Sequence, residues 1–283
     1  MKIFVYGATG TVGQNLIQRL LAGGHEVLAA SRKPEAGKKH AGLTWVEADA
    51  LKPGVGLDAL EKVERAFFIS PPGYTDQFSI LNPWLEKAKA LKLKKFVLMT
   101  AMGVEHAPPE APFRKLELAL ESSGLNWNII RPNWFMQNFH TFWVSGILKD
   151  RKIYFPGGKA RVSFIDARDI ASVAASLLTG DAHNNKAFAL TGGEAINHDE
   201  VAAKLSASTG LSIGYVDITD EDFKAGLLGA GLPEDYASFM VYIAGSLRAG
   251  NAAPIADSIK SITGKDPITF DQYAKDFSQA WKG

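Results

Sequence analysis

Three glycines, Gly7, Gly10 and Gly13, lie in a short loop directly after the apolar run 3–6 and before a helical pattern. In a strand–loop–helix unit of this kind, one glycine permits the tight turn, one lets backbone N–H groups approach a phosphate, and one lets the helix pack close to the strand. The start of the helix adds unpaired N–H donors and the positive end of the helix dipole. The loop therefore predicts a site for the diphosphate of a dinucleotide, whereas the alternative is an ordinary glycine-rich turn. The predicted cofactor-binding residues of the loop are Gly7, Thr9, Gly10, Thr11, Val12 and Gly13.

The end of the second predicted strand, over residues 25–33, indicates which nicotinamide coenzyme is bound. A site that prefers NAD usually has an Asp or Glu here, which accepts a hydrogen bond from the ribose 2′-hydroxyl. This chain has Ser31 and Arg32 instead. Because a serine hydroxyl and an arginine fork bind a phosphate that a carboxylate would repel, NADP(H) is favoured over NAD(H). The alternative for Arg32 is a position in a solvated basic loop.

Composition and charge narrow the class of protein. The chain has 283 residues, a formal net charge of +1 and no cysteine. No basic tract indicates a nucleic acid or a membrane surface as a partner, and no apolar run reaches the roughly 20 residues of a membrane helix. Without cysteine, thiol catalysis and thiolate-bound metals are excluded, and the six histidines show no metal-ligand spacing. We therefore expect a cytoplasmic protein that binds no metal, nucleic acid or membrane, with monomer and homodimer both open.

Strand and helix patterns alternate through the first half of the chain. This order is typical of right-handed βαβ units and predicts an α/β fold, a Rossmann-type doubly wound parallel sheet with a smaller, mostly helical C-terminal lobe. The boundaries expected are 1–155 for the NAD(P)-binding domain and 156–283 for the last sheet elements and a small substrate-binding lobe. Strands are predicted over 3–6, 25–33, 44–47, 65–70, 95–100, 126–132 and 186–191.

Local signals predict several helices and their ends. A helix after the fourth strand either kinks at Pro83 or begins at an Asn82 cap with Pro83 in its first turn. Further helices are predicted over 166–178 and, from an apolar face, over 236–247. Asn197 with a Glu three residues on has the pattern of a capping box, and Thr269 with a Gln three residues on repeats it.

Ligands of open α/β sheets bind beyond the carboxyl ends of the strands. The residues at those ends should trace a path from the adenine to the nicotinamide of the cofactor. Beyond the glycine loop and the second strand, the predicted contacts are Asp49, Ala50, Ser70, Pro71, Thr100, Ala101, Pro132, Asn133, Trp134 and Phe135.

A dense aromatic stretch follows the sixth strand. Its side chains would provide a flat apolar wall for a planar, conjugated small molecule, or they would form the core of the C-terminal lobe. The predicted substrate contacts are Met102, Trp134, Phe135, Met136, Phe139 and Trp143.

The loop Gly7–Gly13, the pair Ser31-Arg32, the strand end 68–70, the helix residues 115–117 and the segment 129–139 resemble the NmrA-like branch of the atypical short-chain dehydrogenase/reductases. The resemblance spans essentially the whole chain. Within that branch, the chain is most similar to the NAD(P)H-dependent quinone and triphenylmethane-dye reductases and to the reductases of ergot alkaloid biosynthesis. The resemblance implies a Rossmann lobe, an NADP(H) cofactor and a small C-terminal substrate lobe.

One position departs from the wider family. Short-chain dehydrogenases use a Tyr-x-x-x-Lys pair, in which the lysine assists proton transfer by the tyrosine to a carbonyl oxygen. Lys115 fits the lysine position, but Ala111 stands where the tyrosine is expected, and Thr100 lies near the position of the family's serine. Acceptors that need less acid assistance, such as quinones, dyes and iminium ions, are therefore favoured.

Lys115 is the one predicted catalytic residue, as a donor to the nicotinamide ribose or to a developing oxyanion, with a solvated helix lysine as the alternative. The sequence as a whole predicts an NADPH-dependent reductase of a conjugated or aromatic acceptor. The alternative is a non-catalytic NADP(H)-binding redox sensor of the NmrA type, which the missing tyrosine fits equally well.

Overall fold

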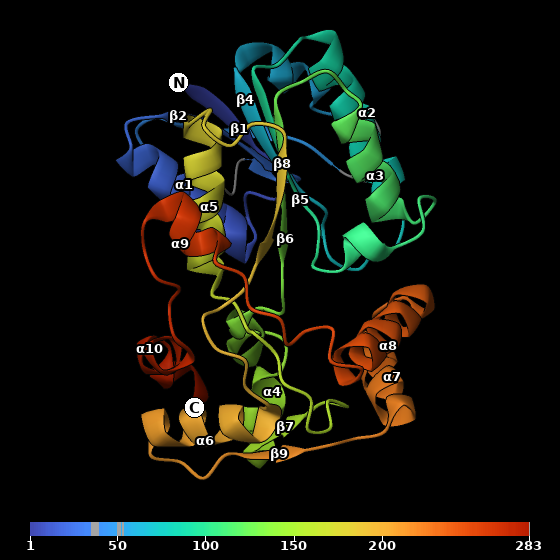
Figure 1. The fold of residues 1–283 in the computed structure, drawn as a ribbon, viewed down its shortest axis with the longest axis vertical. Helices are drawn as coiled ribbons and strands as arrows, with labels where there is room; N and C mark the ends of the chain where they lie inside the picture. The colour runs from blue at the N-terminus through green and yellow to red at the C-terminus, as the bar shows by residue number, and fades with distance from the viewer. Residues whose placement is uncertain (35–39, 50–51, 53, 283) are drawn as a thin grey trace. The chain divides into compact units, whose positions relative to one another are not determined.

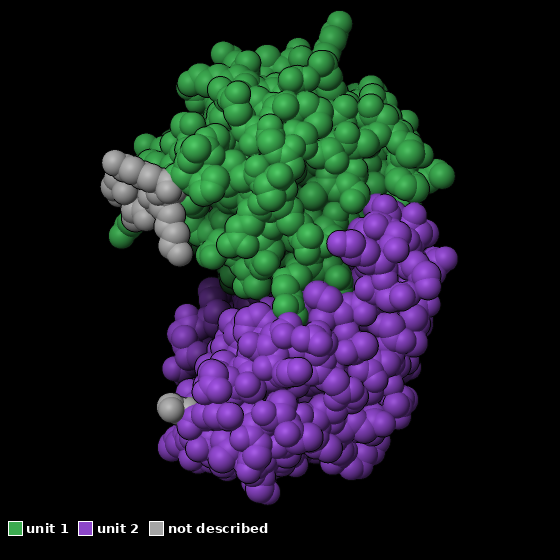
Figure 2. Space-filling view, turned by 90° about the vertical axis from the view of Figure 1, so that its left-hand side faces the viewer, with its two compact units in different colours: residues 1–132, 167–189 green, residues 133–166, 190–283 purple. Residues whose placement is uncertain are grey.

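The computed structural model describes residues 1–34, 40–49, 52 and 54–282. These residues form two compact units (Figures 1 and 2). Unit 1 consists of Met1–Pro132 and Ala167–Ala189, and unit 2 of Asn133–Asp166 and Leu190–Gly283. The chain thus leaves unit 1 after the sixth strand and returns for one more helix and strand. The boundary expected at residue 155 lies inside unit 2.

Unit 1 is built on a seven-stranded sheet with the order β3-β2-β1-β4-β5-β6-β8. Neighbouring strands from β3 to β6 pair in parallel. The order of the strands reverses between β1 and β4, which confirms the predicted doubly wound sheet. The strands are β1 Lys2–Val5, β2 Glu26–Ser31, β3 Leu43–Glu47, β4 Arg65–Ile69, β5 Lys95–Met99, β6 Trp127–Pro132 and β8 Lys186–Leu190.

Helices cover both faces of this sheet (Figure 1). On one face α1 (Thr11–Ala22) packs against α5 (Ala167–Thr179), and on the other α2 (Gln77–Ala90) packs against α3 (Pro112–Glu121). The strands β4 and β5 are short apolar runs, as expected for strands that are covered on both faces. Two 3₁₀ segments, Leu57–Lys62 and Val104–His106, complete unit 1.

An aromatic stack fills the core beneath α2. The ring of Phe68 lies 4.5 Å from that of Phe96, and the ring of Phe4 lies 5.3 Å from that of Trp84. Helix α2 itself begins at Asp76, whose carboxylate accepts a hydrogen bond from the Ser79 amide at 3.1 Å. The helix continues through Pro83, so the alternative of a start at Asn82 is wrong.

Unit 2 is mostly helical and contains a second, two-stranded parallel sheet that the sequence did not predict. Each of its strands has only three residues, too few for a periodicity to be visible. Its elements are the 3₁₀ segment Met136–His140, α4 Val144–Asp150, β7 Lys152–Tyr154, α6 His198–Thr209, β9 Gly214–Val216, α7 Asp220–Gly229, α8 Glu234–Arg248, α9 Ser258–Thr263, α10 Phe270–Asp276 and the 3₁₀ segment Ser278–Trp281.

The predicted helix starts of unit 2 are found where the sequence placed them. At the start of α6 the Asn197 side chain accepts from the Glu200 amide at 2.9 Å, while the Glu200 carboxylate accepts from the Asn197 amide at 2.7 Å, which completes the capping box. Thr269 caps α10 by accepting from the Gln272 amide at 3.2 Å, but the Gln272 side chain turns to Asp276, so only half of that box forms. None of the helices in the described part of the chain is long and apolar enough to cross a membrane.

Candidate nucleotide-binding site

The glycine loop joins β1 to α1 at the point where the strand order reverses. Gly7 has a φ of +78°, and a Cβ at this position would overlap the Ile69 side chain at the end of β4. A Cβ on Gly13 would overlap the carbonyl oxygen of Gly7 and lie 2.8 Å from the Ala8 Cα. Gly7 is therefore required by its positive φ and by the Ile69 side chain, and Gly13 by the close approach of the loop backbone to the helix.

The loop is closed by a hydrogen bond from the Gly10 amide to the Gly7 carbonyl at 3.1 Å. Gly10 caps α1 without a side-chain hydrogen bond, and a Cβ there would make an ordinary contact, 3.4 Å from the Gly7 carbonyl oxygen. The carbonyl oxygens of Thr9 and Thr11 accept from the side chains of Gln14 at 2.7 Å and Asn15 at 2.8 Å. With these carbonyls held, the exposed first turn of α1 offers unpaired N–H groups to an anion.

Only the backbone of Val12 can take part in such a cradle. Its side chain is buried in unit 1, with 2 % of its surface exposed. Thr9 and Thr11 are exposed and therefore present hydroxyl groups as well.

The ends of β2 and β3 lie close to the glycine loop. The Tyr6 hydroxyl, one residue before Gly7, is within electrostatic reach of both Arg32 and Asp49. Burial raises the pKa of Tyr6 to about 12, with Asp49 adding to this rise and Arg32 opposing it. The Ser31 hydroxyl accepts from the Lys33 amide at 3.0 Å, which fixes the turn after β2.

Arg32 and Asp49 differ in their partners. The guanidinium of Arg32 is exposed and forms no ion pair with any residue that the structure describes. Asp49 lies 3.8 Å from the ammonium group of Lys52. The structure thus brings the predicted residues Ser31, Arg32 and Asp49 to one end of the loop, whereas Ala50 lies outside the described residues.

A network of buried charges, missed by the sequence analysis, supports the other end of the site. Glu117 on α3 is fully buried and accepts from the Thr100 hydroxyl at 2.7 Å. The same carboxylate accepts two hydrogen bonds from Arg131 on β6, at 2.9 and 2.8 Å, and one from Arg114 at 2.8 Å. Thr100 is therefore positioned by Glu117, and the network ties the ends of β5 and β6 to α3.

Lys115 neighbours this network but points to solvent. It is exposed in the first turn of α3, and its ammonium lies 4.1 Å from the centre of the Phe78 ring on α2. Such a cation–π contact steadies the long side chain while leaving its three donors available. Ala111, where the family tyrosine is expected, is the N-cap of α3 and contributes no hydroxyl.

The remaining predicted residues of unit 1 also follow the strands β4, β5 and β6. Ser70 and Pro71 are half-buried directly after β4, and Ala101 and Met102 are half-buried after β5. The Met102 amide donates to the carbonyl of Pro132, which is buried at the end of β6.

The predicted residues after Pro132 belong to unit 2 and are engaged there. The Asn133 amide group donates to the Ser163 hydroxyl and to the Ala252 carbonyl, each at 2.8 Å, and its oxygen accepts from the Trp134 amide at 2.9 Å. Trp134 and Phe135 are half-buried. The side chain of Asn133 therefore joins its own loop to the segments at Ser163 and Ala252.

Two of the predicted substrate residues lie in the core of unit 2, the alternative expected for side chains of the aromatic segment. Met136 is 1 % exposed and Phe139 is fully buried, with its ring 4.9 Å from that of Trp143 and 5.3 Å from that of Phe164. Both present no surface to a substrate in this structure. Trp143 is 7 % exposed and lines a pocket of unit 2. The spacing of the aromatic residues did not distinguish buried from exposed side chains, because the segment forms a short 3₁₀ turn and not a longer helix.

Unit 1 therefore has the features that a dinucleotide requires. A tight glycine turn, in which a Cβ at Gly7 or Gly13 would clash with neighbouring atoms, stands at the switch point of the sheet. The guanidinium of Arg32, which has no ion pair among the described residues, stands at the end of β2, where the ribose of a dinucleotide would lie. These residues fit a coenzyme of the NAD(P)H class.

Comparisons with known proteins agree with this geometry. The sequence profile of a family described as NAD(P)H-binding matches residues 7–181. The chain is 31% identical over 282 residues to the oxidoreductase YesF of Bacillus subtilis, covering 99% of this chain and 96% of that protein. It is 31% identical over 287 residues to an NAD(P)H azoreductase of Xenophilus azovorans, covering 99% of both. Among solved structures, the NADPH complex of the quinone oxidoreductase QOR2 from Escherichia coli aligns with a TM-score of 0.84 at 22% identity, covering 98% of this chain and 99% of that one.

Proposed function

The chain belongs to the NAD(P)H-binding, NmrA-like family, and on that basis we propose that it is an NADPH-dependent reductase of conjugated or aromatic acceptors, such as quinones, dyes or imines. The observation that carries the choice of coenzyme is Arg32, exposed beside the glycine loop and without an ion pair in the described part of the chain. The azoreductase relative supports the class of acceptor.

In this proposal the coenzyme is held by unit 1. The first N–H groups of α1 would bind the diphosphate, and the guanidinium of Arg32 with the Ser31 hydroxyl would bind the 2′-phosphate. The absence of a carboxylate at the end of β2 removes the group that would repel this phosphate. When bound, NADPH supplies two electrons as a hydride from its nicotinamide ring.

The protein's own groups suit an acceptor that needs little acid assistance. Ala111 has no hydroxyl, and the Thr100 hydroxyl already donates to Glu117 at 2.7 Å. The ammonium of Lys115 is the nearby group with donors to spare, so it would hydrogen-bond the ribose or a developing oxyanion. A quinone, a cationic dye or an imine stabilises its reduced form by its own conjugation, and the final proton can come from water.

Turnover tests the proposal directly. Purified protein would be mixed with NADPH and, in separate reactions, a quinone, an azo dye, a triphenylmethane dye and a cyclic imine, while NADPH absorbance is followed. We expect oxidation of NADPH with at least one acceptor class. If no acceptor is reduced while calorimetry separates NADPH from NADP⁺ in affinity, the chain is a redox sensor instead.

The coenzyme preference is tested by Arg32→Glu. Loss of a charge-assisted hydrogen bond, worth about 1.5–3 kcal/mol, should weaken NADPH binding roughly tenfold to a hundredfold while leaving NADH binding nearly unchanged. Lys33→Glu is the matched control, because it makes the same change of charge on the next residue. Equal losses for both coenzymes in the Arg32 variant would show that this side chain does not bind the 2′-phosphate.

A further inference from the structure

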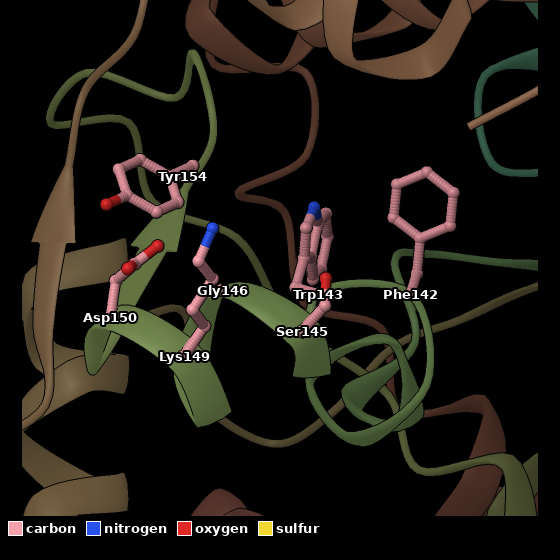
Figure 3. A pocket seen from close by; sticks show the side chains of 7 residues that line it. All are labelled: Phe142, Trp143, Ser145, Gly146, Lys149, Asp150 and Tyr154. Atoms are coloured by element: carbon pink, nitrogen blue, oxygen red, sulfur yellow. The ribbon is translucent and has the colours of Figure 1, made fainter. Parts of the chain in front are cut away.

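A pocket of about 240 Å³ lies within unit 2, between α4 and β7 (Figure 3). Its walls are aromatic: Phe142 is 45% exposed, Tyr154 is 37% exposed, and Trp143 stands between them along the wall in Figure 3. The two exposed rings and Trp143 line the same pocket, and aromatic surface gathered in one place is a feature of ligand-binding sites.

Close approach of α4 to β7 shapes the pocket. A Cβ on Gly146 would lie 2.9 Å from the Lys152 carbonyl oxygen and 3.1 Å from Cδ2 of Tyr154. A glycine in the interior of a helix costs up to about 1 kcal/mol relative to alanine, so its presence here needs a reason. The glycine lets α4 pack directly against Lys152 and the Tyr154 ring.

Four polar side chains line the same space without a partner in the described part of the chain. The Ser145 hydroxyl, the Lys149 ammonium and the Asp150 carboxylate come from α4, and the Tyr154 hydroxyl comes from β7. Figure 3 shows the Lys149 amine extending between Tyr154 and Trp143, while Asp150 lies at the end of α4 farther from Phe142. Lys149 therefore brings a cation between the rings of Tyr154 and Trp143, while the Asp150 carboxylate also lines the pocket.

We propose that this pocket binds a planar aromatic anion, an aryl carboxylate or sulfonate. Its ring would contact the aromatic wall formed by Phe142, Trp143 and Tyr154, its acidic group would pair with Lys149, and the Ser145 hydroxyl would donate to the same group. The volume suits one or two fused rings, since a cavity of about 150 Å³ holds benzene and most drug-sized sites exceed about 300 Å³. The site belongs to unit 2 alone and does not depend on the proposed reductase function.

Calorimetry with three ligands of one shape tests the charge requirement. The probes are 2-naphthoate, the neutral 2-naphthamide and the cationic 2-naphthylmethylammonium ion, each titrated into the full chain without coenzyme and again with saturating NADP⁺. We expect naphthoate to bind three- to fivefold more tightly than the amide, as an ion pair at the rim of a pocket allows, and the cation to bind most weakly. NADP⁺ should leave the naphthoate titration unchanged.

Two variants locate the binding. Lys149→Gln should reduce naphthoate affinity to that of the amide and leave the amide unaffected, whereas Lys159→Gln, which removes the same charge from an exposed lysine outside the pocket, should change neither. Phe142→Ala should weaken all three probes. Naphthoate that binds no better than the amide, binding that survives Lys149→Gln, or tighter binding of the cation would each overturn the proposal. These titrations test the pocket even if the chain reduces none of the acceptors, because they measure binding and not turnover.

Discussion

The pH dependence of stability should be dominated in unit 2 by His198. This side chain is fully buried at the first position of α6, between the rings of Phe155 at 4.9 Å and Tyr215 at 5.2 Å. Neither of its ring nitrogens has a hydrogen-bonding partner among the described residues. Burial lowers the pKa of His198 from 6.5 to about 4, although Asp199 and Asp217 act in the opposite direction.

The direction of the change in stability with pH depends on whether the folded or the unfolded chain binds the proton at the higher pH. In the unfolded chain His198 is protonated as the pH falls below about 6.5, whereas the folded protein keeps it neutral until about pH 4. The stabilising contribution is therefore fully present above pH 6.5 and is lost as the pH falls toward 4. Each pKa unit corresponds to about 1.4 kcal/mol, so the whole loss should be about 3 kcal/mol.

The measurement compares wild type with His198→Phe, which keeps an aromatic ring between Phe155 and Tyr215 and removes the titration. Urea unfolding followed by circular dichroism at intervals from pH 7.5 to pH 4 gives the free energy of unfolding of each. Relative to the variant, wild type should lose about 3 kcal/mol across this range, most of it below pH 6.5. His106→Gln, at an exposed histidine, is the control. A wild-type-minus-variant difference that stays constant with pH would refute the reasoning.

Three further predictions concern unit 1. Glu117→Gln breaks a buried ion network and should lower the free energy of unfolding, measured by chemical denaturation, by about 3 kcal/mol. Glu121→Gln, at the partly exposed neighbour, should lower it by less than about 1 kcal/mol. Similar losses in the two variants would contradict the role assigned to Glu117. Gly13→Ala should lower the melting temperature and abolish NADP⁺ binding in calorimetry, because a Cβ at this position has no space. Gly10→Ala should have a melting temperature close to that of wild type. Melting temperatures close to wild type for both variants would argue against the packing described for the loop. Lys115→Met should lower kcat/KM for an accepted quinone or dye about tenfold, and unaltered kinetics would make Lys115 a solvated helix lysine.

The parts of the fold that could be predicted are those whose pattern lies within a short run of consecutive residues. Apolar runs such as 65–69 and 95–99 are strands, the glycine loop joins β1 to α1, and Asn197 with Glu200 forms its capping box. Each has a pattern within a few consecutive positions, which a period or a spacing reports.

The features that escaped prediction depend on contacts between distant segments. Glu117 looks like one more charge on a helix, and only the meeting of α3 with β5 and β6 buries it against Arg131 and Thr100. Phe139 and Phe142 stand three positions apart in one aromatic segment, yet the first is fully buried and the second is 45% exposed. The sequence could therefore indicate the loops of the candidate nucleotide site, which remain predictions, but it could not indicate their buried support or the unit 2 pocket.

The return of residues 167–189 to unit 1 has a consequence for truncation. A fragment ending at residue 155 would contain the whole glycine loop, but it would lack α5, which packs on α1, and β8, which pairs beside β6. It would expose an apolar helix face and a bare sheet edge, the surfaces through which incomplete domains aggregate. A shortened protein that keeps unit 1 intact must therefore retain residues 167–189, and a single proteolytic cut cannot separate unit 1 from unit 2.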